Sequence, residues 1–322
     1  MNTKKKKNSL LFGIVTWSIT AFCFYAVFLK IEKAASIKGL NIYDYLFLFF
    51  NQANWIAWLA LMIPYSCFFF LVDAHVTWRV VRWFNAPALK FPKILPVRGS
   101  AYILALINEQ VGKGAISLYL WKRHDVPPWQ AVSSMVMLGM MEIYQLLIFS
   151  AIGTALYFEL VTEASTVLPL NKILPAVFGI AAIYFPTHLL YFRNETRVLP
   201  KLKAMQIFRT FRMADLKHYL MVVLLKAPNL LGAVFVYTLA LKLFNVNVGF
   251  GEMLAFLPVI FLAAALPLPF HAGALLLWVV IFPEFPEVGI FSLVMHTFFV
   301  LFNASIGVVF LPRANRELFS EH

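Results

Sequence analysis

The chain has 322 residues, of which 61% are hydrophobic and 13% are charged, and its mean hydropathy is +0.79. Soluble domains are nearer half apolar and a quarter charged, so this composition excludes an ordinary soluble domain and a disordered chain. With 14 glycines, 17 prolines and two cysteines, it also excludes a collagen-like fibre and a disulfide scaffold. An integral membrane protein remains. Its net charge of +12 lies mainly between apolar segments, so we expect no nucleic-acid partner.

Apolar runs long enough to cross a bilayer, which takes about 20 residues at about 1.5 Å each, recur along the chain. The runs without charge are residues 8–29, 45–72, 173–192, 253–283 and 288–312. Two more contain one charge each, Glu142 in 126–158 and Lys226 in 219–241. The first run follows Lys4–Lys7 but is too long for a signal peptide, so we expect a retained helix.

The segment 99–121 is interrupted by Glu109 and by Gly112-Lys113-Gly114. If it crossed the membrane fully, the seven basic residues of 193–217 would face the outside, against the positive-inside rule. We therefore predict that it enters from the cytoplasm and returns, as two half-helices joined at Gly112-Lys113-Gly114. The basic stretches then all become cytoplasmic: 1–7, 79–98, 122–123 and 193–217.

The segment 253–283 would make a helix of about 46 Å, longer than one crossing. It contains Pro258, Pro267 and Pro269, which disrupt a helix interior. A second re-entrant hairpin, entered from the outside, places 20 of the 27 Lys and Arg at the cytoplasmic side. Two kinked but ordinary helices are the alternative for these two segments.

The predicted fold is all-α, with six spanning helices and two re-entrant hairpins in a single transmembrane domain, 1–322. The first repeat is 1–158 with its hairpin at about 99–121, and the second is 173–312 with its hairpin at about 253–283. The two repeats have opposite orientations, and both termini are cytoplasmic. Interrupted apolar segments at matching places in two halves are typical of a transporter's substrate site.

Ionisable side chains inside a membrane are costly and are therefore functional candidates. Glu109 and Lys113 are four residues apart, a spacing that favours an ion pair on a helix. Either they neutralise each other, or Lys113 and neighbouring amides receive an anionic headgroup while Glu109 balances the empty site. Gly112 and Gly114 favour the second interpretation because glycines let a ligand approach the backbone.

Glu142 has no partner nearby in the sequence, so we expect it to face the protein interior or a hydrated cavity and to act in gating or proton coupling. Lys226 either extends its ammonium to the cytoplasmic interface or joins the site. His271, in the second hairpin, is either the counterpart of Lys113 or a structural histidine. The full set of substrate-binding candidates is Asn108, Glu109, Gly112, Lys113, Gly114, Glu142, Lys226, Pro267, Pro269, His271 and Gly273.

Enzyme signatures are absent from the sequence. It contains no H-E-x-x-H, no Cys/His cluster with metal-ligand spacing, no G-x-S-x-G and no complete phosphate-binding loop. Asp73-Ala74-His75 is interpreted as polar residues at a helix end rather than part of a transferase site. We expect no catalytic residue, no metal and no cofactor.

The residues from Tyr102 to Gly112-Lys113-Gly114, continuing through Tyr119 to Ala131, resemble the lysylphosphatidylglycerol synthase transmembrane-region family, also called flippase-like. The stretch from Phe256 through Leu266-Pro267-Leu268-Pro269 to Gly273 is similar to that family's C-terminal signature. The resemblance implies a polytopic inner-membrane protein with inverted repeats. For relatives fused to a synthase domain, it implies that a modified phospholipid moves between leaflets.

Two positions depart from the family pattern. Ala115-Ile116-Ser117 stands where many members carry Arg and Glu, and Ala274-Leu275-Leu276 stands where many carry a Gly-rich run ending in an acidic or amide residue. We expect a stand-alone member without the soluble aminoacyl-transferase domain, so the resemblance argues against lipid synthesis by this chain.

The sequence therefore predicts a flippase or transporter of a lipid or lipid-linked precursor in a bacterial cytoplasmic membrane. The anionic headgroup of a phospholipid or polyprenyl-linked lipid would bind between the two hairpins. The alternatives are a membrane-embedded transferase that acts on a lipid carrier and a non-catalytic accessory subunit.

Overall fold

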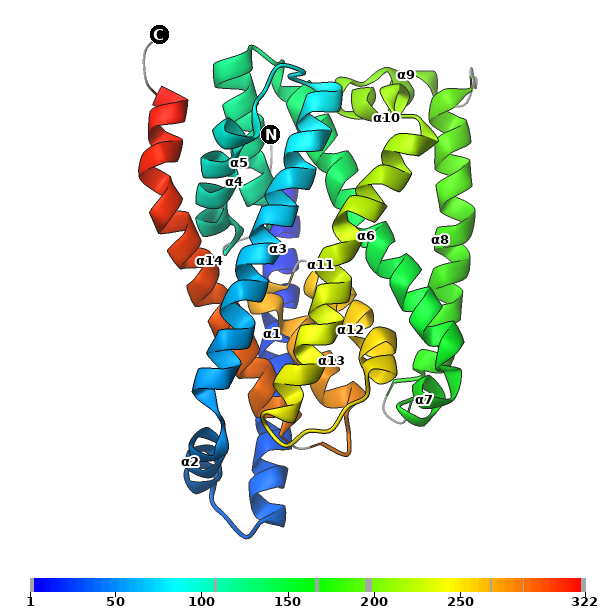
Figure 1. Cartoon of the computed structure of the whole chain (residues 1–322). Helices are drawn as coiled ribbons and strands as arrows, with labels where there is room; N and C mark the ends of the chain where they lie inside the picture. The colour runs from blue at the N-terminus through cyan, green and yellow to red at the C-terminus, as the bar shows by residue number, and fades with distance from the viewer. Residues whose placement is uncertain are drawn as a thin grey trace. The chain divides into compact units, whose positions relative to one another are not determined.

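The computed structural model describes residues 3–106, 109–165, 168–194, 199–266, 268–285 and 287–319, and for 3–12 and 109–111 the backbone alone. Within these ranges every regular element is a helix (Figure 1). Six helices are long and apolar enough to cross a membrane, as a multi-pass membrane protein requires. They are α1 (Thr3–Ile37), α3 (Trp55–Phe84), α6 (Pro128–Leu156), α8 (Leu170–Arg193), α11 (Leu216–Lys242) and α14 (Val288–Phe319).

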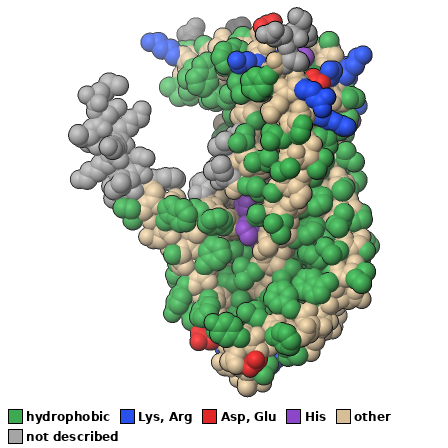
Figure 2. Space-filling model, turned by 90° about the vertical axis from the view of Figure 1, so that its left-hand side faces the viewer, with side chains coloured by type: hydrophobic (Ala, Val, Ile, Leu, Met, Phe, Trp, Pro, Cys, Tyr) green, Lys and Arg blue, Asp and Glu red, His purple; other side chains and the backbone are tan. Residues whose placement is uncertain are grey.

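Large apolar side chains on these helices face outward instead of being buried. Ile180 and Ile183 on α8 and Val309 on α14 are all about 70% exposed. Hydrophobic side chains make up much of the face drawn in Figure 2. Exposure of such a large apolar surface to water is unfavourable, whereas contact with the lipid acyl chains of a bilayer is favourable.

The remaining helices are short. They are α2 (Ile42–Gln52), α4 (Phe91–Ala105), α5 (Glu109–His124), α7 (Phe158–Glu163), α9 (Pro200–Ala204), η1 (Gln206–Phe208), α10 (Arg209–Met213), α12 (Phe250–Ala264), η2 (Pro269–His271) and α13 (Ala272–Ile281). Two pairs among them pack together as helical hairpins, α4 with α5 and α12 with α13.

The chain forms two compact units, and each is built from three separate segments. Unit 1 comprises Met1–Met62, Phe149–Leu174 and Val234–Phe298, and unit 2 comprises Ile63–Ile148, Pro175–Ala233 and Phe299–His322. Unit 1 therefore contains the hairpin α12–α13, and unit 2 contains the hairpin α4–α5.

In unit 1, α13 packs against both α12 and α1. A Cβ added at Gly273 would lie 2.9 Å from the carbonyl oxygen of Ala263, so this glycine allows α13 to approach the backbone of α12. The connection before α13 places Phe270 and His271 in the left-handed region, with φ of 57° and 50°. The Phe270 ring contacts Trp17 of α1 edge-on, with the ring centroids 6.1 Å apart.

In unit 2, α4 and α5 lie side by side (Figure 1). Gly112 has the same role here as Gly273 in unit 1, because its added Cβ would lie 3.0 Å from the carbonyl oxygen of Ala101 and 3.1 Å from Cβ of Ala105. The buried core around this hairpin includes Ile116 and Leu120 of α5. One face of α5 thus packs into this core.

The predicted span at 45–72 is wrong in its boundaries. The run is broken after Gln52, and α3 begins at Trp55 and continues to Phe84. Asn54 accepts a hydrogen bond from the Ala57 amide at 3.0 Å, as an N-cap residue does, so it starts a new helix within the apolar run. The predicted span also ends at residue 72, just before Asp73, a charge that α3 instead carries in its interior.

The first hairpin is also placed differently from the prediction. Its helices are 91–105 and 109–124, so the connection falls at 106–108 and not at Gly112-Lys113-Gly114. Those three residues are helical, and the amides of Lys113 and Gly114 are therefore engaged in α5 instead of being available to a ligand. The second hairpin occupies 250–281, close to the predicted 253–283. That either hairpin is re-entrant, and that the two halves of the chain are inverted repeats, stays a prediction.

Candidate functional site

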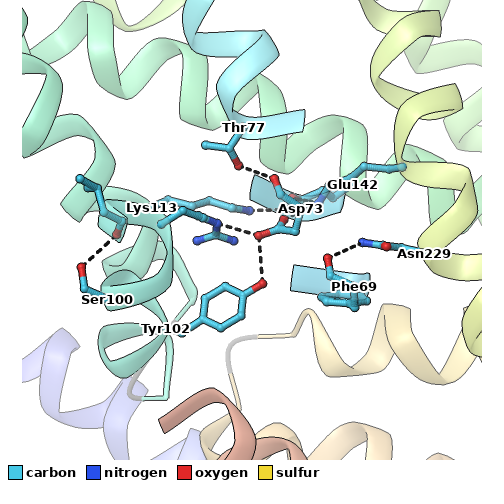
Figure 3. Close-up of polar contacts among 11 residues, drawn as sticks. Phe69, Asp73, Thr77, Ser100, Tyr102, Lys113, Glu142 and Asn229 are labelled. Carbon is cyan, nitrogen blue, oxygen red and sulfur yellow. Dashed lines mark hydrogen bonds and ion pairs between the residues drawn. The ribbon is translucent and has the colours of Figure 1, made fainter. Parts of the chain in front are cut away.

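Five charged side chains from five helices of unit 2 come together. They are Asp73 of α3, Arg98 of α4, Lys113 of α5, Glu142 of α6 and Lys226 of α11, called the charge network below. Their side chains are only 3%, 6%, 5%, 17% and 9% exposed, in that order. Figure 3 shows Asp73, Lys113 and Glu142 directed toward one another.

The network consists of alternating cations and anions. Arg98 Nε donates to Asp73 Oδ2 at 2.7 Å, and Lys226 Nζ lies 3.1 Å from Asp73 Oδ1. Lys226 also donates to Glu142 Oε1, and Lys113 Nζ donates to Glu142 Oε2 at 2.5 Å. Lys226 therefore joins the two carboxylates, and each carboxylate is bound by two cations.

Burying such charges is costly unless each is paired and hydrogen-bonded. The five groups carry three positive charges and two negative charges at neutral pH. Removal of one partner from a buried pair leaves an uncompensated charge and typically costs about 3–5 kcal/mol. These ion pairs thus connect the five helices, and breaking any one of them is expected to destabilise the fold strongly.

Tyr102 supports the Arg98 end of the network. Its hydroxyl donates to Asp73 Oδ2 at 3.1 Å, and the Arg98 guanidinium lies 5.0 Å from the centre of its ring, a cation–π contact (Figure 3). Arg98 and Tyr102 are four residues apart and so share one face of α4. Nη1 of Arg98 is buried and has no hydrogen-bond acceptor among the described residues.

Two neighbours shape the space around the lysines. A Cβ added at Gly139, on α6, would lie 3.1 Å from the Lys113 ammonium, so this glycine leaves room for Lys113 to reach Glu142 one turn further along α6. Asn229, one turn beyond Lys226 on α11, donates to the carbonyl of Phe69 at 3.2 Å, and its Oδ1 is buried without a partner among the described residues.

The structure brings three of the sequence-predicted candidates, Lys113, Glu142 and Lys226, into one network. Gly112 serves the packing of α5 on α4, whereas Gly114 is exposed with no atom within 4 Å of an added Cβ. Asn108 lies outside the described residues, as does the side chain of Glu109, so the predicted Glu109–Lys113 pair stays a prediction.

The candidates of the second hairpin lie in unit 1. Pro269 opens η2, Gly273 packs α13 on α12, and Pro267 lies outside the described residues. The ring of His271 lies near that of His296 on α14, with their centroids 5.7 Å apart. Unit 1 thus has two neighbouring imidazoles, one from its hairpin and one from α14, whereas the hairpin of unit 2 carries Lys113.

Sequence reasoning missed Asp73, Arg98, Tyr102 and Gly139. The sequence predicts a helix end at Asp73, but this residue lies 11 residues before the end of α3 and is buried in two ion pairs. The sequence predicts a cytoplasmic position for Arg98, but this residue lies inside α4 and is buried against Asp73. The spacing of Arg98 and Tyr102 on one helix face is the signal that could have identified this side of the network.

Among the described residues, no group of three or more His, Cys, Asp or Glu side chains is arranged to hold a metal ion. Comparisons with models of protein families, with curated proteins and with solved structures found no match for this chain. The resemblance to the flippase-like family therefore stays a prediction, and functional inference depends on the charge network itself.

Proposed function

We propose that the protein translocates a lipid with an anionic headgroup across a bacterial cytoplasmic membrane. The observation that carries the proposal is the charge network, five ionisable groups buried in helices of a multi-pass membrane protein. Ionisable side chains at such positions are rare because of their cost, and they typically mark a substrate or ion pathway. Among the described side chains of the network, three cations face two carboxylates, which favours an anionic ligand.

The lengths of the short helices support re-entrant hairpins. The helices of the two hairpins have 15, 16, 15 and 10 residues, so each spans about 15–24 Å, less than the roughly 30 Å of a hydrocarbon core. Non-helical connections at membrane depth are tolerated where protein buries them or where they line a hydrated cavity. We infer that α4–α5 and α12–α13 turn back within the membrane, as inverted repeats would have them.

Basic residues support cytoplasmic ends for the helices of unit 2. This unit carries 18 of the 27 Lys and Arg. At the ends of its helices, Arg209 donates to the carbonyl of Phe84, and Arg123 donates to the carbonyl of Glu317. The end of α3 therefore lies beside α10, and the end of α5 lies beside the C-terminal end of α14. By the positive-inside rule we infer that these ends face the cytoplasm.

A membrane-embedded transferase is less well supported. Such an enzyme would need a carboxylate able to take a proton from an acceptor group. Both carboxylates of the network are already bound by two cations each, so while the site is empty their oxygens are engaged in ion pairs and are not directed at an acceptor group. A translocase needs no such base, because it changes the sidedness of a lipid and none of its bonds.

A leaflet-accessibility assay in proteoliposomes tests the proposal. We expect purified protein to move a fluorescent phosphatidylglycerol between leaflets, and Lys113→Ala and Lys226→Ala to slow this movement at least tenfold. The matched control is Arg193→Ala, which removes a cation from an exposed pair with Asp215 and should leave the rate unchanged. Unchanged movement in both lysine variants would contradict the proposal. A donor-dependent chemical change in the lipid would instead identify a transferase.

A further inference from the structure

An additional anion cannot simply be added to the charge network. Lys113 and Lys226 are both bonded to Glu142, and Lys226 and Arg98 are both bonded to Asp73. An incoming anion would meet two carboxylates at close range, and like charges repel strongly where the dielectric constant is low. Binding therefore requires that one carboxylate lose its charge or leave its partners.

The two carboxylates differ in how firmly they are held. Asp73 accepts from Arg98, Lys226 and the Tyr102 hydroxyl, and its side chain is 3% exposed. Glu142 is bonded only to the two lysines among the described residues, and its side chain is 17% exposed, the most in the network. Glu142 also has one more methylene, and so a longer reach. It is the carboxylate that an incoming anion can displace.

Displacement of Glu142 would create an anion site in its place. Both lysines that converge on Glu142 come from different helices, α5 and α11, and would lose the carboxylate that they share. On the other side of Asp73, the Nη1 group of Arg98 offers a buried donor that has no acceptor among the described residues. Guanidinium and ammonium donors together suit the oxygens of a phosphate group.

Protonation of Glu142 keeps the buried charge constant. The resting network holds three cations and two carboxylates. If Glu142 takes one proton and a singly charged phosphate diester enters, the positive and negative charges again differ by one. The occupied state then carries the same net charge as the resting state, so the cost of burying net charge in the membrane does not rise.

We propose that headgroup binding is coupled to the uptake of one proton by Glu142, so that the protein is a proton-coupled symporter of an anionic lipid. This inference rests on the proposed function. The proton comes from the aqueous phase on the side where the lipid binds, resides on a Glu142 carboxylate oxygen while the phosphate occupies the lysines, and leaves on the opposite side when the lipid does. No covalent bond of the lipid forms or breaks.

The groups that face Glu142 from the surrounding helices are consistent with this role. They are Lys113 of α5, Lys226 of α11, Asp73 of α3, and Arg98 and Tyr102 of α4. While the site is empty, the two lysines attract the Glu142 carboxylate and the nearby Asp73 carboxylate repels it. A phosphate that binds the two lysines takes them away from the Glu142 carboxylate and brings a negative charge close to it. Both changes favour protonation of Glu142.

Proteoliposomes with fluorescent phosphatidylglycerol and a pH-sensitive dye in the lumen provide the test. With the outside one pH unit more acidic, we expect the wild-type protein to shift the inner-to-outer lipid ratio by up to about tenfold, since one pH unit is a tenfold difference in proton activity. We also expect lumenal acidification that depends on the lipid. A fluorescent diacylglycerol, which lacks the phosphate, should produce neither signal.

Glu142→Gln imitates the protonated carboxyl group. We expect this variant to move the lipid with no dependence on the pH gradient and no lumenal acidification, whereas Glu142→Asp keeps a carboxylate and should retain coupling. The matched control is Glu163→Gln, an exposed residue of α7 that should behave as wild type. Retention of the gradient dependence by Glu142→Gln would overturn the assignment of the proton to Glu142.

The two proposals fail in distinguishable ways. If the wild-type protein moves lipid without any response to the pH gradient or any lumenal acidification, the coupling is wrong and the translocase stands. If it moves no lipid, the proposed function itself is wrong. If Glu142→Gln does not fold, the two wild-type signals still decide whether protons move with the lipid. Acidification driven by inorganic phosphate alone would overturn the lipid as the coupled ligand.

Discussion

Alanine substitutions at Gly112 and Gly114 should have opposite effects on stability, although the two residues lie two positions apart in the same helix. An added Cβ at Gly112 would lie 3.0 Å from the carbonyl oxygen of Ala101, 3.1 Å from Cβ of Ala105 and 3.3 Å from the Ala105 amide nitrogen. Two of these three atoms belong to the backbone of α4, so they cannot move without shifting the helix. At Gly114 no atom lies within 4 Å.

The expected magnitudes follow from two effects. Alanine is better than glycine in a helix interior by about 0.5–1 kcal/mol, and this gain applies at both positions. Overpacking at Gly112 costs about 1–3 kcal/mol and applies there alone. Gly114→Ala should therefore be neutral or stabilising, and the difference in the free energy of unfolding between the two variants should be about 1–3 kcal/mol, which isolates the contact with α4.

Thermal stability of the detergent-solubilised protein measures this difference. The fraction that stays monodisperse after heating, followed by size-exclusion chromatography, gives an apparent midpoint for each variant. Since 1 kcal/mol shifts Tm by about 2–4 °C in domains of 150–250 residues, we expect the Gly112→Ala midpoint to lie a few degrees below that of Gly114→Ala. Equal midpoints, or a lower one for Gly114→Ala, would refute the close packing of α5 on α4.

Three further variants probe the network and the start of α3. Gly139→Ala places a Cβ beside the Lys113 ammonium without changing any charge, so we expect slower lipid movement with little loss of stability; a rate equal to that of wild type would contradict the role of Gly139. Asp73→Asn should lower the free energy of unfolding by about 3–5 kcal/mol, because it leaves the buried Arg98 without its carboxylate. The double variant Asp73→Asn/Arg98→Gln should recover part of this loss. A double-mutant cycle measured by thermal denaturation tests both expectations. Asn54→Ala should cost about 1 kcal/mol through loss of the N-cap, measured the same way, and an unchanged midpoint would count against that cap.

The sequence is informative about the fold because its main signal, the length of apolar runs, is local. All six long apolar helices overlap a predicted span, and both hairpins overlap a predicted interruption. The boundaries were wrong where an uncharged polar residue begins a helix within an apolar run, as Asn54 does, and where a charge does not end one, as at Asp73. Whether a charged residue can lie inside a membrane helix depends on an oppositely charged partner from another helix. Local hydropathy contains no information about that partner.

The candidate site was predictable only in part for the same reason. Lys113, Glu142 and Lys226 stand out because each is a charge in an apolar segment. Arg98 does not, because it follows a basic stretch that resembles a cytoplasmic loop, and only its pairing with Asp73 across 25 residues identifies it as buried. Gly139 has no sequence signal at all, since its role is the space that it leaves for a lysine on another helix.

The order in which the network residues are synthesised constrains how the chain enters the membrane. Asp73 and Arg98 are 25 residues apart and Lys113 and Glu142 are 29 apart, so each carboxylate has one cation within a short length of nascent chain. Lys226 follows Glu142 by 84 residues, yet it is bonded to both carboxylates. Helices α3 and α6 are therefore synthesised well before the cation that joins them. Before α11 is inserted, each carboxylate can already pair with one cation, so the insertion of α11 adds the third cation and with it the excess positive charge of the network.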